Sequence, residues 1–231
     1  MHICLFDIDG TLIRSGGAGQ GTFEVILEQH FGIVEGCEGV SFSGRTDRAI
    51  LRDLFARHAI EDSEDNWNTF REAYLELLPQ KMSERPGWVL PGVVELLAEL
   101  TARDDVLLGL LTGNLAEGAR LKLSHYGLFD HFRFGGFGDV HVDRNDVARD
   151  ALANARAYQE ETNGSSNGDA EVWVIGDTPL DVAAARAIDA RAIAVLTGWH
   201  SRERLGVTEP DLLLDDLTDT ETLLALWDQP V

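Results

Sequence analysis

Short apolar runs alternate with amphipathic helical segments along most of this 231-residue chain. The runs have the length and flanking residues of buried strands and lie at 3–6, 106–111, 132–134, 172–175, 192–196 and 212–214. Between most of them the apolar residues have helical spacing, at 93–102, 116–126, 145–158, 179–188 and 218–227. Strands that alternate with helices form parallel sheets covered on both faces. The pattern therefore predicts an α/β fold with a doubly wound parallel sheet.

One segment breaks this alternation. Residues 16–88 show helical spacing around Phe23 and over 48–58 and 67–82, without a convincing strand. Glycine and proline flank the segment on both sides, as expected for hinges. The run 17–21 (GAGQG) is similar to a phosphate-binding loop but lacks the lysine, so we interpret it as part of a hinge. We expect a helical domain of residues 16–88 inserted into a core of residues 1–15 and 89–231.

Composition limits the partners that the chain can have. Asp and Glu number 40 against 19 Lys and Arg, a formal net charge of −21, so nucleic acid and anionic membranes are poor partners. A salt-adapted surface would explain the same excess. The two cysteines do not make a disulfide framework, which fits the reducing cytoplasm. The polar stretch 162–169 is expected to be a connector.

Four carboxylates follow the predicted strands. Asp7 and Asp9 come directly after the first strand, and Asp177 follows the strand at 172–175, with Asp181 a helical offset later. Ligands of open parallel sheets bind beyond the carboxyl ends of the strands. Crowded carboxylates repel one another unless a cation lies among them, and hard oxygen ligands favour Mg²⁺. We therefore expect Asp7, Asp9, Asp177 and Asp181 to form a magnesium site.

Groups that bind anions follow the neighbouring strands. Thr112 offers a hydroxyl, Gly113 and Asn114 offer backbone amides before a helix, and Arg144 offers a forked cation. A metal beside an anion cradle and spare carboxylates favours phosphoryl transfer. In this interpretation Asp7 attacks phosphorus and a second carboxyl group handles the leaving-group proton.

These motifs resemble those of the haloacid dehalogenase superfamily of hydrolases. Residues 7–11 (DIDGT) resemble its first motif, 111–114 (LTGN) its second and 176–181 (GDTPLD) its fourth. The insert contains residues 43–47 (SGRTD), which are similar to a cap segment of the phosphoglycolate phosphatase branch. The resemblance implies a Rossmann-like core with an inserted α-helical cap domain.

The resemblance also implies roles for single residues. Asp7 would be the nucleophile that forms an aspartyl-phosphate, and Asp9 the general acid/base whose backbone carbonyl binds Mg²⁺. Thr112 and Asn114 would bind the phosphoryl group, Asp177 would bind Mg²⁺, and Asp181 would do so directly or through water. In the cap, Arg45 and Thr46 are the expected substrate contacts. Three of these residues have a purely structural alternative. Asp181 would favour a helix start, Arg144 would form a surface ion pair, and Arg45 would be an exposed cation.

The sequence departs from the family in its third motif, which usually has a lysine followed by proline. Lys81 lies in the insert and Lys122 inside a helix before the third strand, so neither occupies that place. We predict that Arg144 takes the role, with Arg133 as the weaker candidate.

The function predicted from these residues is a Mg²⁺-dependent phosphatase of a small phosphorylated metabolite, and the resemblance to the branch suggests phosphoglycolate. A phosphomutase or a non-catalytic binding module on the same fold are the alternatives. A dehalogenase is disfavoured because Asp9 is present, and a phosphonate hydrolase because Lys81 is the only lysine of the insert. The expected protein is cytoplasmic, a monomer or homodimer, without nucleic acid or membrane partners.

Overall fold

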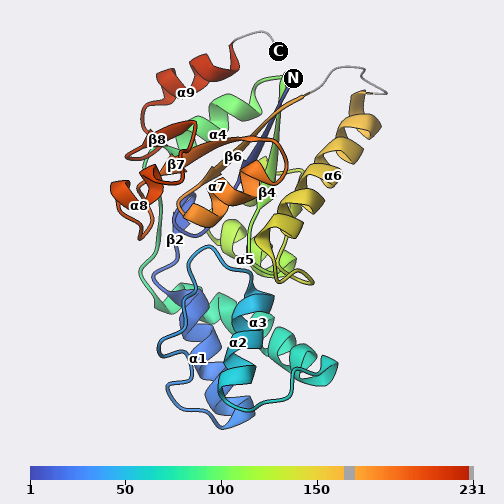
Figure 1. Ribbon diagram of the computed structural model, residues 1–231, viewed down its shortest axis with the longest axis vertical. Helices are drawn as coiled ribbons and strands as arrows, with labels where there is room; N and C mark the ends of the chain where they lie inside the picture. Colours follow the sequence, from blue (N-terminus) through green and yellow to red (C-terminus); the bar gives the residue numbers. More distant parts are fainter. Residues whose placement is uncertain (164–169, 229–231) are drawn as a thin grey trace.

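A six-stranded parallel sheet forms the centre of the computed structural model, which describes residues 1–163 and 170–228 (Figure 1). The strand order is β5-β4-β1-β6-β7-β8. The strands are β1 (His2–Phe6), β4 (Val106–Leu111), β5 (Phe134–Gly136), β6 (Glu171–Gly176), β7 (Arg191–Val195) and β8 (Leu212–Leu214). The chain therefore places β1 between β4 and β6, and the predicted doubly wound parallel sheet is confirmed.

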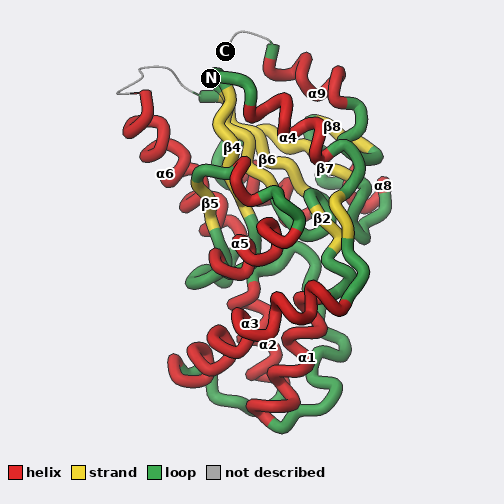
Figure 2. The backbone as a smooth tube through the Cα atoms, turned by 180° about the vertical axis from the view of Figure 1, so that it is seen from behind, coloured by secondary structure: helices red, strands yellow, loops and turns green. Residues whose placement is uncertain are grey.

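Helices cover both faces of this sheet (Figures 1 and 2). Alternate residues of β1 point to opposite faces, as strand geometry requires. Cys4 and Phe6 belong to one hydrophobic cluster, while Ile3 and Leu5 belong to the other. The first cluster includes residues of α4 (Val93–Thr101), α5 (Ala116–His125) and α9 (Thr220–Trp227). The second includes residues of α6 (Arg144–Asn163), α7 (Pro179–Arg186) and α8 (Arg202–Gly206).

Three further helices lie together at one end of the molecule (Figure 1). They are α1 (Ala18–Phe31), α2 (Asp47–Arg57) and α3 (Glu64–Glu84). A third hydrophobic cluster holds them together, with Phe23, Phe70 and Tyr74 in mutual ring contact at its centre. Apart from Leu115, its buried residues come from positions 18–82. These helices pack at the end of the sheet where the parallel strands finish.

A short antiparallel ribbon joins the two parts of the chain. It pairs β2 (Ile13–Arg14) with β3 (Trp88–Val89), where the chain enters and leaves the helical segment. The sequence indicated no strand up to Trp88, so β3 was not predicted. The boundaries at 15/16 and 88/89 fall beside or within this ribbon, and the division into two domains stays a prediction.

Other differences from the predicted elements are local. The third strand of the chain's core occupies Phe134–Gly136 instead of 132–134, because Leu110 and Leu111 of β4 pair with Gly135 and Gly136. Glycines are rare in strands, so the pattern did not include them. Before it lies a 3₁₀ turn, η1 (Phe129–His131), and Phe132 is buried outside the strand. Residues 164–169, most of the predicted connector, lie outside the described residues. Along 1–163 and 170–228, no helix has the length and apolar character needed to cross a membrane.

Candidate active site

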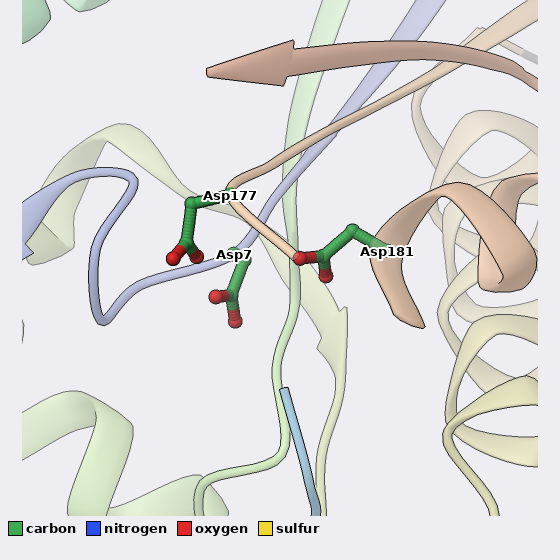
Figure 3. A group of neighbouring side chains, drawn as sticks. All are labelled: Asp7, Asp177 and Asp181. Carbon is green, nitrogen blue, oxygen red and sulfur yellow. The ribbon is translucent and has the colours of Figure 1, made fainter. Parts of the chain in front are cut away.

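Three buried carboxylates converge at the carboxyl end of the sheet (Figure 3). Asp7 follows β1, Asp177 follows β6, and Asp181 lies in the first turn of α7. One oxygen from each lies within 4.8 Å of the other two. The backbone amide of Asp7 donates to Ile175 O at 2.9 Å, which extends the pairing of β1 and β6 up to the site. The strand-end positions inferred from the sequence therefore bring these three acids together.

Burial makes this cluster electrostatically costly. It raises the pKa of Asp7 to about 6, against the lowering effect of Arg144 and with a further increase from Asp181. It also raises the pKa of Asp177 well above its usual value, and the charges of Asp181 and Asp7 add to the rise. Buried carboxylates of this kind take up protons or bind a cation. A set of hard oxygen donors with excess negative charge fits a divalent ion such as Mg²⁺.

Arg144, the first residue of α6, lies between two of the acids. Its Nη2 lies 2.8 Å from Asp7 Oδ1 and 2.6 Å from Asp181 Oδ1. The same guanidinium donates to the carbonyls of Gly44 and Leu111 at 3.1 and 3.2 Å. The structure thus brings Arg144 to Asp7, whereas Arg133 is exposed and outside the site.

Asp181 has both of its carboxylate oxygens engaged. Oδ2 accepts from the Thr178 amide at 2.9 Å and from the Thr178 hydroxyl at 2.7 Å, forming the capping box that begins α7. Oδ1 faces Arg144. Asp181 is therefore a helix-start residue as well as a member of the cluster.

Asp9 points to a different set of partners. Its Oδ2 lies 2.6 Å from Lys122 Nζ and accepts from Asn114 Nδ2 at 2.9 Å, and Ser15 donates to Oδ1 at 3.2 Å. Burial alone would raise the pKa of Asp9, but the charge and hydrogen bond of Lys122, with Asn114 and Ser15, bring it below its usual value. The carboxylate of Asp9 is not part of the three-acid group.

Lys122 is the residue that sequence reasoning missed. It was placed in a helix away from the site, yet its side chain is buried and its Nζ also donates to Asn114 Oδ1 at 2.6 Å. Its spacing could have shown this. Gly118, Ala119, Lys122 and Leu123 make up the buried face of α5, at the i, i+3 and i+4 positions that one helix face shares.

The loop after β4 holds the remaining predicted phosphate ligands. Thr112 Oγ1 accepts from Asn114 Nδ2 at 2.7 Å and from the Asn114 amide at 3.3 Å, which leaves its own proton free to donate. A Cβ on Gly113 would lie 2.0 Å from Arg45 O, so only glycine allows the helical segment to approach this loop. Thr112, Gly113 and Asn114 all line the cavity described below.

Residues 43–47 of the helical segment contact the loop after β4 beside the site. The Asp47 amide donates to Gly113 O at 2.7 Å, and Asp47 Oδ2 accepts from the Leu115 amide at 2.9 Å, at the start of α5. Ser43 Oγ lies 3.1 Å from His200 Nε2. Burial, opposed by Lys122, raises the pKa of Asp47 to about 6. The sequence analysis included Asp47 in the cap segment 43–47 but gave it no role and did not predict this contact with the core.

The two cap residues predicted to contact substrate have other partners. The Arg45 guanidinium pairs with Asp53 Oδ2 at 2.6 Å, although Arg45 still lines the cavity. Thr46 is buried, caps α2 by accepting from the Ala49 amide at 3.0 Å, and donates to Val142 O. Its hydroxyl does not line the cavity, so the structure gives Thr46 a place in helix capping.

A cavity of about 680 Å³ lies between the sheet edge and the helical segment. Its lining includes Asp7, Asp9, Asp177, Lys122 and Arg144. Beyond the acids it extends past the start of α1 to Tyr74 and Phe23. The acidic cluster therefore opens onto a space large enough for a small organic substrate.

Comparison with known proteins places this site in context. A family model described as haloacid dehalogenase-like hydrolase matches residues 4–195. Phosphoglycolate phosphatase of Synechococcus elongatus is 30% identical over 226 residues, covering 95% of each chain. Validoxylamine A 7'-phosphate phosphatase of Streptomyces hygroscopicus subsp. limoneus is 26% identical over 221 residues, covering 94% of each.

Solved structures share the fold. A hydrolase from Pseudomonas syringae matches with a TM-score of 0.72 at 20% identity, over 98% of this chain and 99% of that one. CbbY from Rhodobacter sphaeroides in complex with phosphate matches with a TM-score of 0.69 at 18% identity, over 95% and 96%. At these identities the likeness supports the architecture alone.

Proposed function

Because the chain belongs to the haloacid dehalogenase-like hydrolase family, we propose that it is a Mg²⁺-dependent phosphatase of a small phosphorylated metabolite. It is a phosphoric monoester hydrolase, and the two relatives described above are named phosphatases. The observation that carries the proposal is the position of Asp7. Asp7 directly follows the central strand β1. Its carboxylate belongs to the buried three-acid cluster and lines the cavity.

Asp7 is the nucleophile in this proposal. Arg144 holds its Oδ1, whereas Oδ2 makes no hydrogen bond with the described residues and is available to attack phosphorus. Attack forms the bond between Asp7 and phosphorus and breaks the bond between phosphorus and the ester oxygen. The product is an aspartyl-phosphate and a free alcohol.

Asp9 carries the proton of both half-reactions. As the ester bond breaks, protonated Asp9 gives its proton to the leaving oxygen. Asp9 then accepts a proton from the water that attacks the aspartyl-phosphate, which releases phosphate and restores the Asp7 carboxylate. Lys122 and Asn114 fix the orientation of Asp9 through both steps.

The donor set fits a magnesium ion. Asp7 and Asp177 have carboxylate oxygens that are not committed to protein partners. Asp181 Oδ1 forms an ion pair with Arg144 but no hydrogen bond, so Asp181 would bind the ion directly or through water. The backbone carbonyl of Asp9 is a further expected ligand. When bound, the ion would offset the repulsion between the Asp7 carboxylate and an anionic phosphate. Thr112, Gly113, Asn114 and Arg144 would bind the phosphoryl oxygens.

The helical segment would act as a cap. Residues 43–47 contact the loop after β4 beside the cavity and would close over it, and the β2–β3 ribbon would be the hinge. Phosphoglycolate is the proposed substrate at the level of the branch, since a relative bears that name. The buried free thiols of Cys4 and Cys37 support a reducing cytoplasm, and the acidic surface supports neither nucleic acid nor membrane partners. A monomer or homodimer is expected.

Phosphate release from an aryl phosphate and from 2-phosphoglycolate tests the proposal, with and without Mg²⁺. Asp7→Asn is nearly isosteric but a poor nucleophile, so we expect activity to fall by roughly 10³-fold or more. Asp130→Asn, at an exposed position, is the matched control and should keep full activity. Near-normal turnover by a correctly folded Asp7→Asn protein, checked by circular dichroism, would refute the mechanism. Isomerisation of the substrate without phosphate release would indicate a mutase.

A further inference from the structure

The cavity has a second polar region beyond the carboxylates, beside the start of α1. Lys122 Nζ and the Tyr74 hydroxyl converge on one point there. A Cβ on Gly19 would lie 3.5 Å from Lys122 Nζ and 3.6 Å from the Tyr74 oxygen. Gly19 belongs to the glycine-rich run that is similar to a phosphate-binding loop but lacks its lysine. In the folded chain α5 brings a lysine to that run.

Tyr74 has an unused hydroxyl at this point. Its side chain is 1% exposed and lines the cavity, and its hydroxyl makes no hydrogen bond with any residue of 1–163 or 170–228. The oxygen itself is not among the fully buried unpaired atoms of the described residues, because it borders the cavity, where a ligand can reach it. Burial, followed by the charges of Asp47 and Asp9, raises the pKa of Tyr74, so the group stays a proton donor.

The first turn of α1 adds further donors. No side chain caps this 14-residue helix, and no acidic residue lies in its first turn. The amides of Gly19 and Gln20 have no acceptor among the described residues. Helix N-termini favour anions, because their free amides and the helix dipole point the same way.

Lys122 supplies a further donor. An ammonium group has three protons, and Asp9 and Asn114 accept two of them. The point therefore has two donors beside it, an ammonium and a hydroxyl, and the two free amides lie at the adjoining helix start. Their natural ligand is an oxygen group that only accepts hydrogen bonds.

We propose that Gly19, Gln20, Tyr74 and Lys122 form a subsite for a second anionic oxygen group, a carboxylate or second phosphate, carried by the leaving group. The assignment rests on the proposed phosphatase function, since Asp9 marks the place of the ester oxygen. Lys122 Nζ lies 2.6 Å from the Asp9 carboxylate, so the second group must lie only a few bonds from the ester oxygen. The substrates selected are compact phosphate esters with two anionic ends.

Gly19→Ala tests the subsite with little effect on the fold. The new methyl meets Lys122 and Tyr74 at ordinary contact distances, residue 19 does not need a left-handed backbone, and alanine favours a helix. The methyl fills the space that the ligand oxygen requires. We expect the ratio of kcat/KM for 2-phosphoglycolate to that for the neutral ethylene glycol monophosphate to fall at least roughly tenfold. Tyr74→Phe should lower the same ratio while keeping the melting temperature, since the lost hydroxyl has no partner in the described structure. Gly206→Ala, in a helix with open space around it, is the control and should leave the ratio unchanged.

Binding to the Asp7→Asn protein separates the two proposals. Calorimetry with 2-phosphoglycolate should show affinity that Gly19→Ala weakens at least roughly tenfold, whether or not the wild type turns the compound over. Pyrophosphate in the same assay shows whether a second phosphate is accepted in place of a carboxylate. Absence of phosphatase activity would overturn the proposed function. Unchanged ratios and affinities in both Gly19→Ala and Tyr74→Phe, or equal use of the neutral ester by the wild type, would overturn the subsite.

Discussion

Replacing Arg144 by alanine removes the guanidinium that lies between Asp7 and Asp181. The side chains of Arg144, Asp7 and Asp181 are 5%, 6% and 2% exposed, so the carboxylates would remain buried without that partner. Two carbonyls, of Gly44 and Leu111, would lose a donor as well. Breaking a buried ion pair from one side leaves an uncompensated charge, which typically costs about 3–5 kcal/mol. We expect this loss of folding stability in the absence of Mg²⁺.

The assay is thermal unfolding in a chelator at pH 8 and at pH 5. For a chain of this size, each kcal/mol moves the melting temperature by about 2–4 °C, so the variant should melt roughly 10 °C below wild type at pH 8. The deficit should shrink at pH 5. Arg144 lowers the pKa of Asp7, so without it burial raises this pKa further. The folded variant then holds a proton that the unfolded chain releases above pH 4, and its stability falls as pH rises.

Arg133→Ala is the matched control for this experiment. Arg133 is exposed and its side chain has no ion pair among the described residues, so its loss should change stability by less than about 0.5 kcal/mol. Arg144→Lys should recover part of the stability, because it restores the charge but not the second nitrogen of the fork, Nη1, which donates to Gly44 O. The reasoning fails if Arg144→Ala melts within two degrees of wild type at pH 8, or if its deficit is the same at both pH values.

Two further outcomes follow from the same geometry. Mg²⁺ at about 100 times its dissociation constant should stabilise the native protein by about 2.7 kcal/mol. The melting temperature should therefore rise, a chelator should reverse the rise, and Asp177→Asn should diminish it. An unchanged melting temperature would argue against the metal site. Asp9 must be protonated when the ester bond breaks, so it sets the alkaline limb of the kcat/KM profile. Lys122→Met should move this limb to higher pH, because it removes the cation that lowers the pKa of Asp9. Lys122→Arg keeps the charge and should leave the limb in place, and a limb that stays put in Lys122→Met would contradict this role.

The sequence predicted the parts of the site that depend on strand order. Asp7 and Asp177 each follow an apolar run, and parallel strands end at one edge, so their meeting needed only the alternation of strands and helices. Arg144 could be placed from the same logic, because it begins the helix after β5. The third strand was predicted two residues too early, at 132–134. The strand at 134–136 pairs with β4 through two glycines, and glycine has a low propensity for strands.

Contacts between the helical segment and the core could not be predicted in this way. Asp47 accepts from the Leu115 amide across 68 residues of sequence, and this contact depends on how the two parts dock. The spacing of buried residues in α5 was enough to predict that Lys122 points inward. Its partner Asp9 could not be predicted, because it is 113 residues away in the sequence. Arg45 and Thr46 were located in the right segment, yet its approach to Gly113 uses backbone atoms rather than those side chains.

Asp7 and Asp9 lie two residues apart and have opposite electrostatic environments. Burial among two other acids raises the pKa of Asp7, whereas Lys122 and Asn114 outweigh burial and lower that of Asp9. Successive residues at a strand end point in alternate directions, but residues two apart share a face, so the strand alone cannot separate them. The separation comes from the turn that begins after Asp7, where Gly10 donates its amide to Ile13 O, and from cations on different helices. Arg144 on α6 approaches Asp7 and Lys122 on α5 approaches Asp9, from the two faces of the sheet. A doubly wound sheet therefore gives two neighbouring aspartates different cations, and pairs of carboxylates with divergent pKa values are suited to divide nucleophilic and proton-transfer roles.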